Sequence, residues 1–283
     1  MTRQTLSVEN SGGRSSAAGP KRLLSPQRLQ LVRSFLVTIG SLSAAVVLWH
    51  ILSTYFLNPR LVPPPLSVLK TSLPMLESGE LVGHAAISLW RILVGFSTGC
   101  IAAIVLGVLM GRMRVLNDSL EPIIEVLRYL SPTAMIPIAI IWFGIGEMSK
   151  YFLIFWSTFF FVLINTIAGV IRTPVTRQRA AQCLGASELQ IFLLVVLPSA
   201  VPYIVTGMRV AMASAFMAII PAEMLAANSG IGYLLQQSGV LMQTNRIFVA
   251  LAVICILGFL SDRVFQWLVN ITMAKYLMTP AGK

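Results

Sequence analysis

Long apolar runs separated by short polar segments dominate the pattern of this chain. Six runs are about 20 residues or longer, the length at which a helix crosses a hydrocarbon core about 30 Å thick. The pattern therefore predicts an all-α membrane protein with six transmembrane helices in one domain, residues 34–274. The predicted spans are 34–57, 88–111, 119–146, 151–171, 198–223 and 247–273.

Small residues recur at helical spacing in two of these runs. Each series leaves a smooth face that lets another helix approach closely. For the second run we expect packing within the subunit rather than a dimer seam. The second run carries Gly95, Gly99, Ala103, Gly107 and Gly111, and the fifth carries Ala211, Ala215, Ala218 and Ala222 with Ser214 beside them.

The composition agrees with a membrane protein, since 56% of residues are hydrophobic and 11% are charged. Soluble proteins carry roughly 25% charged residues. We assign the net charge of +11 to loops on the cytoplasmic side and not to nucleic-acid binding, because the basic residues cluster between apolar runs. This places both termini in the cytoplasm. Residues 1–33 read as a disordered basic tail and 275–283 as a short second tail.

One segment, residues 172–197, is neither a span nor a tail. Arg172, Arg177 and Arg179 place it in the cytoplasm by the positive-inside rule. Gly185 follows a small-residue run and precedes an apolar run that ends at Leu197-Pro198. The segment is predicted to form a short helix, a glycine turn and a second helix that leads into the fifth span.

Ionisable residues and prolines inside the runs are the candidates for function. Arg209 and Glu223 are 14 residues apart, about 21 Å along a helix, so they cannot pair with each other. Glu223 is either a functional acid at membrane depth or a capping acid at the interface. Pro132 and Pro137 are expected to break the third run, where freed backbone groups face protein or a water-filled cavity.

Motifs for catalysis and nucleotide binding do not occur in the sequence. There is no phosphate-binding G-x-x-x-x-G-K-[ST] loop, no H-E-x-x-H and no G-x-S-x-G. Cys100, Cys183 and Cys255 are isolated, which predicts neither a disulfide nor a metal site. We expect no catalytic residue, no metal and no cofactor on this chain. The residues alone indicate a transporter subunit, with an ion-coupled carrier and an intramembrane enzyme as the other classes.

The cytoplasmic segment resembles the "EAA" loop of bacterial ABC importer permeases, E-A-A-x-x-x-G followed about a dozen residues later by L-P. Here the run from Arg179 through Ala180 and Ala181 to Gly185, with Leu197-Pro198, matches in spacing. Arg179 stands where that pattern has its glutamate. The flanking runs LVPPPLSVL, ISLWRILVGF, LEPIIEVLRYLSPTAMIPIAIIWFGIGEMSK, LPSAVPYIVTGMRVA and AEMLAANSGIGYL are similar to the nitrate/sulfonate/taurine group of these permeases.

The resemblance implies a type I ABC importer transmembrane fold in the bacterial inner membrane. It implies a pathway formed by two permease copies, with two separate ATPase subunits that bind ATP and magnesium and a periplasmic binding protein that delivers the solute. The expected solute is a small anion, with sulfonate or taurine first and nitrate or bicarbonate next; a neutral pyrimidine precursor is the alternative. The residues expected to contact the ATPase are Arg177, Arg179, Ala180, Ala181, Leu184, Gly185, Ala186 and Ser187. The residues expected to line the pathway are Pro132, Pro137, Ser214, Ala218 and Glu223.

Overall fold

The structure is a computed structural model that describes residues 37, 40–41 and 43–277. The chain divides into two compact units, Met1–Leu52 and Ser53–Lys283. The predicted tail 1–33 and residues 278–283 lie outside the described residues. At the junction of the units an apolar helix covers Ser43–Phe56. It is shorter than the predicted first span, which also includes positions outside the described ranges.

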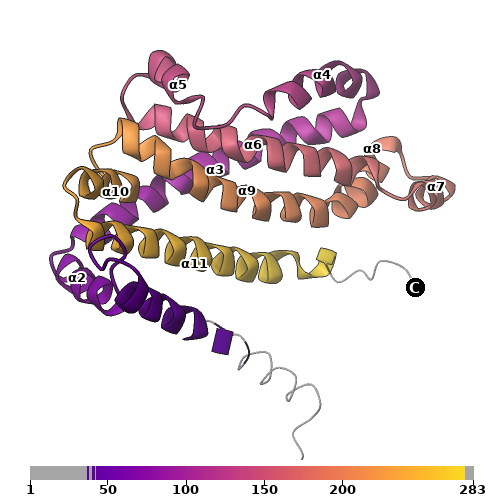
Figure 1. Ribbon diagram of the computed structural model, residues 1–283. Helices are drawn as coiled ribbons and strands as arrows, with labels where there is room; N and C mark the ends of the chain where they lie inside the picture. Colours follow the sequence, from indigo (N-terminus) through magenta and orange to yellow (C-terminus); the bar gives the residue numbers. More distant parts are fainter. Residues whose placement is uncertain (1–36, 38–39, 42, 278–283) are drawn as a thin grey trace, which may run out of the picture. The chain divides into compact units, whose positions relative to one another are not determined.

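The described residues form helices and contain no strand, as predicted for an all-α protein. The elements are η1 (Leu52–Phe56), α2 (Pro65–Glu77), α3 (Glu80–Arg112), α4 (Arg114–Leu127), α5 (Ile136–Phe143), α6 (Glu147–Ile171), α7 (Val175–Cys183), α8 (Glu188–Ile191), η2 (Phe192–Val196), α9 (Leu197–Ala226), α10 (Ile231–Val240) and α11 (Thr244–Leu277). In Figure 1, α4 and α5 lie above the group formed by α3, α6 and α9, and α11 lies below it.

Four of the described helices are long and apolar enough to cross a membrane, whereas the sequence predicted six. They are Glu80–Arg112, Glu147–Ile171, Glu188–Leu225 and Thr244–Met273. The third predicted span, 119–146, is interrupted, as expected from its prolines, because α4 ends at Leu127 and α5 starts at Ile136. Pro132 lies in the break and Pro137 in the first turn of α5, as their missing N–H groups require. With eight residues, α5 is about 12 Å long and too short to span.

The glycine series of α3 packs against α6, which confirms the expected packing within the subunit. A Cβ at Gly95 would lie 2.5 Å from the Cβ of Ile154, and one at Gly111 would lie 2.6 Å from the Cβ of Val170. Such separations do not occur between real side chains, so each position requires glycine. The partners on α6 follow the same four-residue rhythm as the glycines, and they are Ile154, Thr158, Thr166 and Val170.

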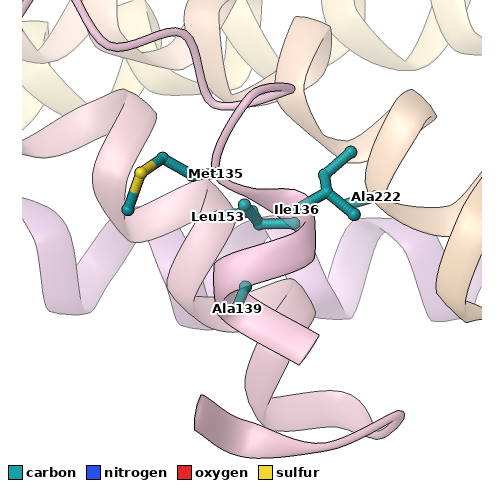
Figure 2. Packing of buried hydrophobic residues seen from close by; sticks show 5 residues of the cluster. All are labelled: Met135, Ile136, Ala139, Leu153 and Ala222. Carbon is teal, nitrogen blue, oxygen red and sulfur yellow. The ribbon is translucent and has the colours of Figure 1, made fainter. Parts of the chain in front are cut away.

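On its other side α6 packs against α9. The alanine stripe of α9 is buried, with Ala211, Ala215 and Ala222 fully inaccessible to solvent. Figure 2 shows how the short α5 is held at the end of this group, where Ile136 and Ala139 lie beside Leu153 of α6 and Ala222 of α9. The central helix α6 therefore holds α3, α5 and α9 in fixed positions and supports the two candidate sites at opposite ends of α9.

Candidate functional site

The segment between α6 and α9 has the predicted helix, glycine turn and second helix. Gly185 ends α7 with a φ of +79°, and two backbone bonds close the turn: Gly185 N–H donates to the Gln182 carbonyl and Ala186 N–H to the Ala181 carbonyl. This pair of bonds is the Schellman arrangement that ends many helices. Ser187 then caps α8 through a reciprocal pair of hydrogen bonds with Gln190. Hydrogen bonds therefore fix the end of α7 before Gly185 and the beginning of α8 after it.

Most of the residues predicted to contact an ATPase face solvent. Leu184 is 88% exposed, and the exposed set also includes Arg177, Arg179, Ala180, Gly185 and Ser187. Ala181 and Ala186 are half-buried against the apolar cluster of Val170, Ile191, Val196, Ala200 and Ile204. The segment thus has an open outer face and an inner face that packs on α6 and the beginning of α9.

A cation–π contact adds to this attachment. The Arg112 guanidinium at the end of α3 lies 4.8 Å from the centre of the Phe192 ring in η2. Because η2 runs directly into α9, the α7–α8 segment is joined to α9 through the chain and to α3 and α6 through side-chain contacts. The α7–α8 segment is therefore placed to couple a bound partner to the spanning helices.

A cluster of buried charges occupies the opposite end of the same helices. Arg91 of α3 is 2% exposed and Glu223 of α9 is fully buried. Arg91 Nη1 donates to Glu223 at 2.8 Å, and Nε and Nη2 donate to the two carboxylate oxygens of Glu147 at 2.6 and 2.7 Å. Lys150, one turn further along α6, donates to Glu147 at 2.9 Å. Two positive and two negative charges therefore compensate each other.

The Glu223 carboxylate is satisfied by neutral donors as well. Ser88 Oγ lies 2.8 Å from each of its oxygens, and the Gly232 N–H donates to it at 2.9 Å. Ser88 also accepts a bond from the Ile231 N–H at 2.8 Å, and Arg91 donates to the Ser229 carbonyl at 2.6 Å. The cluster therefore joins α3, α6 and α9 to the turn that precedes α10.

The close approach of that turn depends on Gly230. Its φ is +114°, and a Cβ added there would lie 2.3 Å from the Glu223 carboxylate. The Gly230 N–H donates to His84 Nδ1 of α3 at 3.0 Å. Glycine is required here both for its backbone conformation and for the space that the carboxylate fills.

The sequence singled out Glu223 but missed its partners. Arg91 stands alone in a long apolar run, and 132 residues separate it from Glu223. The available signal was the lone arginine itself, because an ionisable residue in a spanning helix usually has a partner of opposite charge. No spacing rule connects Arg91 with Glu147 or Glu223.

The residues predicted to line a pathway are spread over different surroundings. Pro132 is half-buried in the break between α4 and α5, and Pro137 is exposed. Ser214 is half-buried and Ala218 is buried on α9, while Glu223 belongs to the charge cluster. Arg209 pairs with Asp262 of α11 at 3.0 Å, which agrees with the expectation that it does not pair with Glu223. Among the described residues no three His, Cys, Asp or Glu side chains come together as a metal site.

Comparison with known proteins shows the family of this chain. Residues 103–270 match the family model of the binding-protein-dependent transport system inner membrane component. The taurine transport system permease protein TauC of Escherichia coli is 36% identical over 241 residues, covering 83% of this chain and 88% of TauC. The nitrate import permease protein NrtB of Synechocystis is 31% identical over 270 residues, covering 92% of this chain and 98% of NrtB. The chain belongs to the family of binding-protein-dependent ABC transport permeases, the membrane components of these systems.

Proposed function

We propose that this chain is the membrane subunit of an ATP-driven importer and that two copies form an alternating-access pathway for a small anionic solute. Sulfonates such as taurine are the first choice of solute, followed by nitrate and bicarbonate. TauC and NrtB, which are similar over most of this chain, are named as permeases for taurine and for nitrate. A neutral solute, such as a pyrimidine precursor, is the alternative within the same mechanism.

The observation that carries this proposal is the exposed α7–α8 segment and its attachment to the spanning helices. Its open face carries two arginines and small residues, while its inner face packs on the ends of α6 and α9. A partner ATPase that closes on ATP would push on this face, and the push would reach α3 through the Arg112–Phe192 contact. ATP and magnesium would bind to that partner, and this chain would hold no cofactor.

The remaining parts of the proposal follow from the same arrangement. The α7–α8 segment and both termini would lie in the cytoplasm of a bacterial cell, with the chain embedded in the inner membrane in a type I ABC importer fold. The turns near Arg91 and Glu223 would face the periplasm, where a binding protein would deliver the solute.

The test is to purify the protein with its ATPase and binding protein and to measure ATP-driven uptake into proteoliposomes, with labelled taurine as the probe. We expect copurification of the ATPase and loss of uptake when the ATPase is inactivated. Uptake driven by an ion gradient with this chain alone would instead identify an ion-coupled carrier and refute the proposal.

A matched pair of glycines tests the role of the α7–α8 segment. Gly185 and Gly79 have φ values of +79° and +74°, and a Cβ at either would meet open space. Leucine at either position therefore introduces similar backbone strain, and its Cβ meets no neighbouring atom. We expect Gly185→Leu to abolish coupled uptake or ATPase binding and Gly79→Leu to retain both. Equal effects of the two substitutions would count against the segment as the ATPase contact.

A further inference from the structure

A cavity between α9 and α11 combines an apolar wall with a charged end. Its volume is about 340 Å³. On α9 the lining residues follow one helical face from Arg209 to Phe216 and Ile220, and on α11 they follow one face from Cys255 to Gly258 and Asp262. The result is an elongated groove with apolar side chains along its length and an ion pair at one end.

The ion pair at this end is incompletely covered. Arg209 Nε and Nη2 donate to the two carboxylate oxygens of Asp262 at 3.0 and 3.3 Å, and Gln266 donates to the same carboxylate at 2.6 Å. The Arg209 and Asp262 side chains are 56% and 32% exposed. Arginine has five N–H donors, and two of those on Arg209 are used in these bonds. The other three have no recorded partner among the described residues, so they are available to an oxyanion.

The pair lies toward the ends of both helices that are remote from Glu223 and Thr244. Arg209 precedes Glu223 by 14 residues and Asp262 follows Thr244 by 18, which correspond to about 21 and 27 Å along the respective helices. Apolar residues such as Val205 continue before Arg209, whereas Arg263 and Gln266 follow Asp262. Charges this exposed are costly against lipid hydrocarbon, so we expect the charged end of the groove to contact water. The Arg91–Glu223 pair, in contrast, is sealed inside the helix group.

We infer that this groove is a binding site for the transported solute and that the solute is a small organic oxyanion. Arg209 donates hydrogen bonds to the oxyanion, Asp262 holds the guanidinium in place, and the face from Phe216 to Ile220 contacts the carbon chain. This inference rests on the proposed function and gives it a specific site. The sequence-based pathway residues Ser214 and Ala218 lie on the same helix, α9, but do not line this groove.

Cys255 provides a reporter inside the groove. It is exposed and lines the cavity, two helical turns from Asp262, whereas Cys100 is buried. In a Cys183→Ser background it is the accessible cysteine among the described residues. We would label the assembled complex in lipid nanodiscs, with and without ATP, at low ionic strength. The two probes are 2-sulfonatoethyl methanethiosulfonate, itself an organic sulfonate, and its cationic trimethylammonium counterpart. Both reagents are confined to water, so labelling reports a water-filled groove.

We expect Cys255 to react with both reagents. Arg209→Gln should lower the ratio of anionic to cationic labelling rates by about fourfold or more, because a unit charge about 10 Å away changes each rate by about twofold in bulk water and in opposite directions for the two reagents. Asp262→Asn should raise the ratio, and the double variant should return it toward the wild-type value.

Two outcomes overturn the inference. Labelling only by membrane-permeable N-ethylmaleimide, or by no reagent, would show that lipid or a second copy covers the groove. A rate ratio that is the same in the wild type and in both single variants would remove Arg209 as an anion contact. Because labelling needs no ATP-driven uptake, these results are independent of the taurine uptake test of the proposed function.

Discussion

Removing the Arg91 side chain should destabilise the protein more than any other single arginine substitution in the described helices. In Arg91→Met the Glu223 carboxylate would remain fully buried without its cation, and the Ser229 carbonyl would lose its donor. Breaking a buried ion pair from one side costs about 3–5 kcal/mol. The Glu147 carboxylate would lose less stabilisation than that of Glu223, because it is half-exposed and keeps Lys150 as a partner.

Both members of the Arg91–Glu223 ion pair can also be replaced together. In Arg91→Met/Glu223→Gln no buried charge is left alone, and the glutamine can still accept bonds from Ser88 and the Gly232 N–H. Replacing both members of a buried pair is often nearly neutral. We therefore expect the double variant to recover about 2 kcal/mol or more relative to the sum of the two single variants.

The assay is the free energy of unfolding in detergent micelles, with a double-mutant cycle over the two positions. Arg263→Met serves as the matched control, because Arg263 is also an arginine of a spanning helix but is exposed and contacts only the Phe259 ring among the recorded interactions. Such a contact contributes about 0.5–1 kcal/mol. A loss below about 1 kcal/mol for Arg91→Met, or additive effects of the two single substitutions, would refute the reasoning.

Three smaller substitutions test the packing and the turn. Gly230→Ala should cost several times more stability than Gly239→Ala in thermal unfolding, because its Cβ would meet the buried carboxylate whereas Gly239 faces open space; equal losses would contradict the assigned turn. Gly111→Ala should lower the unfolding temperature, because its Cβ would clash with α6. The control Gly83→Ala should leave the unfolding temperature unchanged or raise it. Similar unfolding temperatures of the two variants would argue against the close contact between α3 and α6. Ser187→Ala removes the cap of α8 and should cost about 1 kcal/mol in the same assay, with no loss expected if the capping bonds do not form.

Local sequence features account for the elements and for much of the helix packing. The four-residue series from Gly95 to Gly111 predicts a smooth helix face, and the structure packs that face against α6. Gly185 predicts the end of α7 because few residues other than glycine adopt its backbone conformation. Pro132 and Pro137 predict a break, since neither has an N–H group to donate. The glycine series, Gly185 and the two prolines each determine structure within a few helical turns, so their effects can be predicted from the sequence.

Only the tertiary structure decided which charges meet. Lys150 lies between two predicted spans, yet its side chain is 4% exposed and donates to Glu147, one turn earlier on α6. Arg91 lies 132 residues from Glu223, and the two meet because the glycines of α3 and the alanines of α9 bring both helices against α6. By itself the sequence determined which residue types occupy the helices and where the helices stop. The pairing of buried charges depends on distances between helices, which residue order alone does not specify.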